Sequence, residues 1–148
     1  LKSGSDVRGV AMGDNTVLTP EVAETLGRAF VAFLAQGLLK KPEQLTIAVG
    51  RDSRLSGPQL LQGVVKGITS TGATAADYEM CTTPAMYMAI LTEGFQPDAS
   101  ISFALKSTQT TRPSRSAKAL SSSLVLSFRA RAFAWRGEDA DAPRGKIG

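Results

Sequence analysis

The sequence predicts an α/β fold, because strand-like and helix-like segments alternate along its first hundred residues. Short apolar runs rich in β-branched residues alternate with longer stretches whose apolar residues recur every three or four positions. A Thr-Pro pair opens two of these longer stretches, and a glycine stands near the end of all three. The order strand, helix, strand, helix, strand, helix, strand is typical of an α/β sandwich.

The first strand is expected over residues 7–12 and the first helix from Thr19 onward. Thr19 is a favoured N-cap, and Pro20 suits the first helical position because its missing N–H would have no partner there. Apolar residues at three- and four-residue spacing define one face of this helix for burial. The predicted buried face is Val22, Ala23, Leu26, Ala29, Phe30, Phe33 and Leu34. We expect the helix to end at Gly37.

Residues 45–49 are apolar and partly β-branched, which predicts a strand covered on both faces. A second helix is predicted over residues 58–71, with Gly72 as a left-handed terminator. A third strand is expected over residues 73–78. Pro84 begins a third helix that ends at Gly94, and a fourth strand spans residues 98–101. The inward-facing residues are predicted to be Leu60, Leu61, Val64, Val65 and Ile68 in the second helix, and Met86, Tyr87, Ile90 and Leu91 in the third.

Composition excludes several classes of protein. The 148 residues suffice for one domain with its own core. A membrane-spanning helix needs about 18 consecutive apolar residues, and no such run occurs, so we expect no membrane partner and a soluble intracellular location, cytoplasm or plastid. Cys81 is the only cysteine, and histidine is absent, which excludes disulfides and removes the commonest zinc ligand. Because the chain begins with Leu1, we interpret it as a piece of a longer product.

Charge divides the chain after Ile101. Residues 1–101 contain eight Lys/Arg and ten Asp/Glu, a balance of −2, whereas residues 102–148 contain nine and three, a balance of +6. The second segment also holds eight Ser and three Thr among 47 residues. We therefore expect one domain over residues 1–101, followed by an irregular or disordered basic tail rich in Ser, Arg and Ala.

The segment Gly-Arg-Asp-Ser-Arg-Leu-Ser-Gly at residues 50–57 is the part most open to a chemical interpretation. It leads from a strand to a helix N-terminus, where backbone N–H groups without partners favour an anion. Arg51 and Arg54 could bind a phosphate there. Alternatively, Asp52 accepts hydrogen bonds from these arginines or from loop N–H groups and only shapes the turn. Taken alone, the loop favours the structural interpretation.

The segment Ser-Gly-Ser-Asp-Val-Arg-Gly at residues 3–9 has two interpretations as well. Arg8 could hold a ligand phosphate at the end of a strand. It could also pair with Asp6 on the surface, for less than about 1 kcal/mol.

Four motifs together resemble one family. These are residues 3–9, Leu-Thr-Pro-Glu at residues 18–21, residues 50–57, and Thr-Thr-Pro-Ala at residues 82–85. In this order they resemble the first domain of the phosphohexomutases, the phosphoglucomutase and phosphomannomutase enzymes. The resemblance covers about residues 2–101 and implies a three-layer α/β/α sandwich.

The resemblance implies a four-domain enzyme that moves a phosphoryl group between the 1- and 6-positions of a hexose phosphate through a phosphoserine. It places Arg8 near the phosphoserine and the substrate phosphate, with Ser3 and Gly4 on the same wall. Arg51, Asp52, Arg54, Ser56 and Gly57 are then supports of the domain's architecture. It also implies Mg²⁺ for the full-length enzyme, held by aspartates of the second domain.

The chain departs from the family after Ile101. The family continues with Thr-Ala-Ser-His-Asn-Pro or a close variant, whose serine carries the phosphate, whereas this chain reads Ser-Phe-Ala-Leu-Lys-Ser from residue 102. We therefore assign no catalytic residue to Ser100, Ser102 or Ser107. No metal ligand is assigned either, because residues 138–141 lack the glycine-flanked aspartate pattern. We expect the chain to be inactive on its own.

Two hypotheses explain residues 102–148. A frameshift or an altered splice after Ile101 is the preferred one. The alternative is a non-catalytic binding module whose basic tail binds RNA or an acidic partner, with Phe133 and Trp135 as stacking groups. Nucleic acid is the less favoured partner, since basic tails bind polyanions weakly by charge alone. Residues 120–128 fit a helix or a strand equally well. If domains are missing, we also expect exposed apolar surface on this one.

Overall fold

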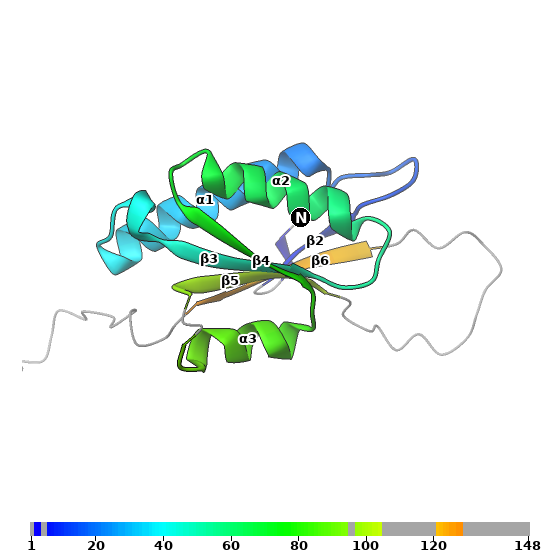
Figure 1. The fold of residues 1–148 in the computed structure, drawn as a ribbon. Helices are drawn as coiled ribbons and strands as arrows, with labels where there is room; N and C mark the ends of the chain where they lie inside the picture. Colours follow the sequence, from blue (N-terminus) through cyan, green and yellow to red (C-terminus); the bar gives the residue numbers. More distant parts are fainter. Residues whose placement is uncertain (1, 4–5, 95–96, 105–120, 129–148) are drawn as a thin grey trace, which may run out of the picture.

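The computed structural model describes residues 2–3, 6–94, 97–104 and 121–128. They form a six-stranded sheet with helices on both faces. Helices α1 (Pro20–Leu38) and α2 (Gly57–Thr69) lie on one face, and α3 (Thr83–Leu91) lies on the other (Figure 1). The α/β fold and its three-layer arrangement are therefore confirmed.

The sheet joins a parallel part to an antiparallel part. Its strands stand in the order β1 (Lys2–Ser3), β2 (Asp6–Val10), β6 (Ser121–Phe128), β5 (Ala99–Ala104), β3 (Thr46–Arg51) and β4 (Thr74–Met80). β3 runs parallel to both of its neighbours, β4 and β5. β6 pairs antiparallel with β5 and β2, and β1 pairs antiparallel with β2. Since α2 joins β3 to β4 and α3 joins β4 to β5, the carboxyl ends of these three strands meet at one edge of the sheet.

Helix α1 begins as the sequence predicts and ends later. The Thr19 side chain accepts a hydrogen bond from the Val22 N–H at 3.3 Å, and Pro20 occupies the first turn. The prediction that Gly37 ends the helix is wrong. Leu39 takes the left-handed conformation at φ 53° instead, and its N–H donates to the Ala35 carbonyl. A short 3₁₀ turn, η1 (Pro42–Gln44), then leads into β3.

The predicted inward faces of two helices need correction. In α1, Ala29 and Phe33 point to solvent, whereas Gly27 and Val31 are buried. In α3 only Met86 and Ile90 are buried; the predicted inward residues Tyr87 and Leu91 are about half exposed, at 51% and 49%. The sheet can cover only one side of α3. Because α3 has apolar residues on both sides, its sequence does not show which side packs against the sheet.

Close contact between α1 and α2 depends on glycine. A Cβ atom at Gly67 would collide with the Glu24 carbonyl oxygen, and one at Gly63 would collide with the Pro20 carbonyl. The two backbones therefore approach more closely than larger residues would allow. Beneath these helices lies the main core, which includes Val31, Leu34, Leu45, Ile47, Val49, Leu60, Val64, Ile68 and Ile101. The Met86 and Ile90 side chains of α3 are buried as well.

Part of the predicted tail belongs to the sheet. β5 continues three residues past Ile101, and β6 lies inside the segment that the sequence assigned to an irregular tail. The choice left open for residues 120–128 is thus decided in favour of a strand. The domain boundary after Ile101 stays a prediction, and the remaining residues of the tail lie outside the described part of the chain.

Across the ranges that the structure describes, no helix combines the length and the apolar character needed to cross a bilayer.

Candidate functional site

The loop after β3 holds its shape through its own residues. Asp52 Oδ1 accepts a hydrogen bond from the Arg54 N–H at 3.3 Å, and its Oδ2 lies 3.2 Å from Arg54 Nε. The Arg54 carbonyl accepts from the Gly57 N–H at 3.0 Å, where α2 begins. Ser56 is buried, and its carbonyl accepts from the Leu60 N–H at 3.2 Å. The loop is thereby fixed between the end of β3 and the first turn of α2.

The same loop is tied to β5. The Asp52 N–H donates to the Phe103 carbonyl at 3.1 Å, which continues the pairing of β3 with β5 beyond Arg51. On the other side, the Cys81 N–H donates to the Arg51 carbonyl at 2.9 Å. The carboxyl ends of β3, β4 and β5 are therefore connected by backbone hydrogen bonds, and side chains that follow them converge on one place.

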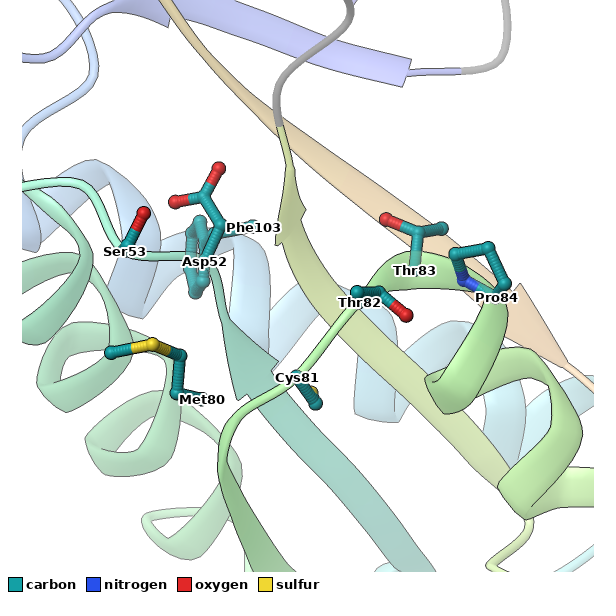
Figure 2. A pocket seen from close by; sticks show the side chains of 8 residues that line it. All are labelled: Asp52, Ser53, Met80, Cys81, Thr82, Thr83, Pro84 and Phe103. Atoms are coloured by element: carbon teal, nitrogen blue, oxygen red, sulfur yellow. The ribbon is translucent and has the colours of Figure 1, made fainter.

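A pocket of about 480 Å³ opens at this edge (Figure 2). Its wall combines residues that follow β3, the segment between β4 and α3, and the end of β5: Asp52, Ser53, Met80, Cys81, Thr82, Thr83, Pro84 and Phe103. The chain continues from β3 to β4 and from β5 to β6. In the sheet, β4 and β6 lie on opposite sides of the adjacent strands β3 and β5. In open α/β sheets, ligands bind outside the carboxyl ends of two such strands.

The N-terminus of α3 forms one side of the pocket. The Thr82 hydroxyl accepts a hydrogen bond from the Ala85 N–H at 3.3 Å, as an N-cap does. Thr83, the next residue, has its hydroxyl 3.2 Å from that of Ser102, which donates to it. Ser102 is 2% exposed, so its hydroxyl is shielded from solvent. This end of the helix carries the positive end of its dipole and favours a negative charge.

Cys81 forms the inner wall next to Gly50. A Cβ atom at Gly50 would collide with Cys81 Sγ and would lie 2.8 Å from Met86 Sδ. Glycine is thus required here for the segment before α3 to lie against β3. Burial raises the pKa of the Cys81 thiol and outweighs a hydrogen bond with Arg51 that lowers it. The thiol is therefore a weak nucleophile at neutral pH.

Arg8 lies two strands away from β5, near the same edge. It stands opposite Ser123 of β6, and Ser123 stands opposite Ala104, the last residue of β5. Neighbouring strands are about 4.8 Å apart, so the Arg8 backbone lies about 10 Å from that of Ala104. The Arg8 side chain is half-buried. The register thereby places the backbone of Arg8 on the antiparallel side of β5, level with the last residue of that strand.

The structure brings together some of the predicted site residues. Asp52 lines the pocket, while Arg51 lies on the α2 side of the same loop, in a hollow with Pro58 and Asp77. Ser3 pairs with Asp6 in β1 and β2, and Gly4 lies outside the described residues. The roles assigned to Arg8, Ser3, Gly4, Arg51, Asp52, Arg54, Ser56 and Gly57 stay predictions.

Sequence reasoning missed most of the pocket wall. Thr82 and Thr83 had a local signal, because a threonine before Thr-Pro predicts a helix N-terminus; this signal predicted the start of the third helix but not a pocket beside it. Cys81, Met80 and Phe103 have no such signal. They meet only because three strands end side by side.

No metal centre is found in the part of the chain that the structure describes. No group of three or more His, Cys, Asp or Glu side chains lies close enough together there to hold an ion. The described residues therefore do not fit Mg²⁺.

Comparison with known proteins decides the family. Residues 1–104 match the model of phosphoglucomutase/phosphomannomutase, alpha/beta/alpha domain I. The chain belongs to this family. The match ends at Ala104, the last residue of β5.

Individual members of the family agree with this assignment. A phosphoglucomutase of Neisseria gonorrhoeae is 36% identical over 88 residues, which are 60% of this chain and 17% of that protein. A phosphoglucosamine mutase of Leuconostoc mesenteroides is 38% identical over 99 residues, 66% of this chain and 21% of the relative. A crystal structure of a family protein from Burkholderia thailandensis is 28% identical with a TM-score of 0.61, covering 86% of this chain and 26% of the other. The chain thus spans about a fifth of the length of these curated relatives.

Proposed function

We propose that this chain is the first domain of a phosphohexomutase and forms the phosphate-facing wall of the site that moves a phosphoryl group between C1 and C6 of a hexose phosphate. The family match from the first residue to the end of β5 carries this proposal. The pocket at the carboxyl edge supports it, because the N-terminus of α3 supplies positive charge there and Arg8 stands two strands from β5 at the level of that strand's last residue.

Each predicted residue has a physical role in this proposal. The Arg8 guanidinium binds the substrate phosphate through charge-assisted hydrogen bonds and offsets the charge that spreads over the phosphoryl oxygens during transfer. Ser3 and Gly4 shape the wall beside it. The Asp52–Arg54 pair fixes the loop between β3 and α2, so that the pocket wall keeps its position while the substrate reorients. We expect the full-length enzyme to bind Mg²⁺ through residues of another domain.

The proposal also holds that the chain does not catalyse the transfer alone. Phosphoryl transfer through an enzyme intermediate needs an accessible hydroxyl as acceptor. Ser100 and Ser102, the two serines of β5, are 1% and 2% exposed, and neither side chain is open to a ligand. In this proposal the domain contributes binding and positioning to an enzyme of hexose metabolism.

A binding measurement and an activity measurement test the two halves of this proposal. Titration of the isotope-labelled chain with glucose 1-phosphate should shift the amide signals of β2 and of the loop after β3, and Arg8→Gln should abolish the shifts. Arg28→Gln removes an exposed cation of α1 and serves as the matched control. Unchanged binding by Arg8→Gln would remove Arg8 from the site.

Activity is measured as conversion of glucose 1-phosphate to glucose 6-phosphate, with Mg²⁺ and hexose bisphosphate present. We expect no turnover by the chain alone. Turnover above the blank, accompanied by a phosphorylated serine in the mass spectrum, would show that the chain contains a working nucleophile and would overturn the non-catalytic assignment.

A further inference from the structure

One hydroxyl of the pocket wall is held in place by a buried residue. Ser102 of β5, which is 2% exposed, donates a hydrogen bond to Thr83 Oγ1 at 3.2 Å. Thr83 itself lines the pocket and is partly exposed. In Figure 2 its hydroxyl lies on the side of α3 that faces Phe103 and Asp52, whereas the Thr82 hydroxyl points toward the helix. A buried hydroxyl therefore orients an accessible one.

The oriented hydroxyl has a proton to donate. A threonine hydroxyl carries one proton and two lone pairs. Ser102 occupies one lone pair of Thr83, so the proton of Thr83 stays available to an acceptor in the pocket. A hydrogen bond to a charged acceptor is roughly twice as strong as one between neutral groups. An anionic oxygen is therefore the kind of ligand atom that gains most from this hydroxyl.

The backbone at the start of α3 offers fewer donors than the start of an ordinary helix. Pro84 has no N–H. The Ala85 N–H donates to the Thr82 hydroxyl at 3.3 Å, and the Met86 N–H donates to the Thr82 carbonyl at 3.0 Å. The N–H of Thr83, at the first helical position, has no acceptor inside the helix. Among residues 83–86, the N–H and the O–H that can be directed at a ligand therefore both belong to Thr83.

The opposite wall of the pocket is less suited to an anion. Asp52 follows β3, and its carboxylate, which pairs with Arg54, accepts hydrogen bonds but donates none. Thr83 is joined to β5, which lies between β3 and β6 in the sheet. Because Arg8 of β2 stands opposite a residue of β6, β5 is the pocket strand nearer to it. A phosphate beside Thr83 is thus farther from the carboxylate and nearer to β2 than one beside the loop after β3.

We propose that Thr83 binds the substrate phosphate through its hydroxyl and its N–H, and that Ser102 is a positioning residue that orients this hydroxyl. These roles rest on the proposed function, since they name the residues on the α3 side that would hold the phosphate there. Ser102 acts through Thr83, because its own side chain is shielded from the pocket. Without Ser102 the Thr83 hydroxyl rotates more freely, and the ligand has to order it on binding.

Titration of the isotope-labelled full chain with inorganic phosphate, and separately with glucose 1-phosphate, tests the role of Thr83. Thr83→Val keeps the branched shape but removes the hydroxyl, and should raise both dissociation constants at least about tenfold. Thr83→Ser keeps a hydroxyl and should retain most of the affinity. Thr92→Val is the matched control, because Thr92 is an exposed threonine at the other end of the same helix. It should leave both dissociation constants unchanged.

A double-mutant cycle separates positioning from a merely structural role of Ser102. Ser102→Ala should weaken phosphate binding about threefold when Thr83 is present. In a Thr83→Val background it should change binding little, because the hydroxyl that it orients is gone. A general loss of packing would instead weaken binding equally in both backgrounds. Urea unfolding of each variant confirms that the folded chain is the species being titrated.

The outcomes distinguish these roles from the proposed function. Equal phosphate affinity of Thr83→Val and the unaltered chain would overturn the role of Thr83, and equal losses for Ser102→Ala in both backgrounds would overturn the positioning role. If Arg8→Gln abolishes the binding of glucose 1-phosphate while Thr83→Val leaves it intact, the roles proposed for Thr83 and Ser102 are wrong and the proposed function stands. If the unaltered chain binds neither ligand, both proposals are wrong.

Discussion

The two halves of the sheet are built in different ways. The parallel half consists of β3, β4 and β5 with the three helices, and it contains most of the buried core among the residues whose burial is described, which do not include those of β6. Ile47, Ala48 and Val49 of β3 are completely inaccessible to solvent. The antiparallel half consists of β1, β2 and β6. The side chains of residues 7–10 in β2 are only half-buried. Among the side chains that are described, the parallel half therefore contributes most of the folding free energy, because burial of apolar surface is its main source.

The family match covers one half of the sheet completely and the other half only in part. It covers the whole parallel half and also β1 and β2, but it omits β6. Since β2 reaches β5 only through β6, the position of Arg8 relative to the pocket depends on residues 121–128. Arg8 lies within the residues that match the family, whereas β6, which sets its position relative to β5, lies outside the match.

Proline in the middle of β6 should have the largest effect. Ser123→Pro removes a backbone donor in a strand that is paired on both sides, and its ring disturbs the ladder. We expect a loss on the order of 3 kcal/mol from unpaired backbone groups. Hydrogen exchange should accelerate in β2 while β3 and β4 remain protected. Ser121→Pro, at the first residue of the strand, is the matched control and should be tolerated. Equal loss of protection in β3 and β4 would show that the two halves unfold as one unit.

Two matched valines compare the halves directly. Val49→Ala in β3 removes methyl groups that are completely buried and should cost about 2–3 kcal/mol in urea unfolding. Val7→Ala in β2 removes the same groups from a half-buried position and should cost about 1 kcal/mol. Similar costs at the two positions would contradict the assignment of most folding free energy to the parallel half.

The parallel half was also the half that the sequence predicted well. Thr19 and Pro20 predict the start of α1 from adjacent residues alone. The apolar, β-branched residues 45–49 predict β3 by their composition. Such signals are local, so they can be recognised in the sequence without knowledge of the tertiary contacts. β6 begins with three serines and has no clear period, and its partners Val7 and Phe103 are far from it in sequence. Only the pairing itself makes it a strand, as expected for β structure, where context outweighs propensity.

Within the site, too, the residues with a local sequence signal were predicted and the others were missed. The loop at residues 50–57 was found because its motif is continuous in sequence. The wall made by Cys81, Met80 and Phe103 was missed, because it exists only where three strand ends converge. The wrong inward faces of α1 and α3 have another cause. Phe33, Tyr87 and Leu91 are apolar, and apolar side chains at helical spacing do not tell which of two apolar sides meets the sheet.

Helix caps offer a smaller test on the two layers of the parallel half. Thr82→Ala removes the acceptor for the Ala85 N–H at the start of α3, and should cost about 1 kcal/mol. Thr19→Ala, which removes the acceptor for the Val22 N–H in α1, should cost a similar amount of free energy. Only Thr82→Ala should also accelerate amide exchange beside the pocket. If both variants leave the pocket amides unchanged, the N-terminus of α3 does not support its wall.

The smallest effect concerns pH and the ion pairs over the parallel half. Hydrogen bonds from Lys66 and then Arg28 lower the pKa of Glu24 in the folded chain. The unfolded chain therefore takes up this proton first as pH falls, at about 4.3. The stabilisation is complete above that pH and is lost as pH falls through the lower pKa of the folded state. Glu24→Gln should flatten this part of the stability profile measured by urea unfolding, and should do so less in a Lys66→Gln background. The Glu24 carboxylate bridges α1 and α2, which both belong to the parallel half. Glu24→Gln should therefore leave the amide protection of β2 unchanged, and a change there would show that the loss of stability in acid extends to the antiparallel half.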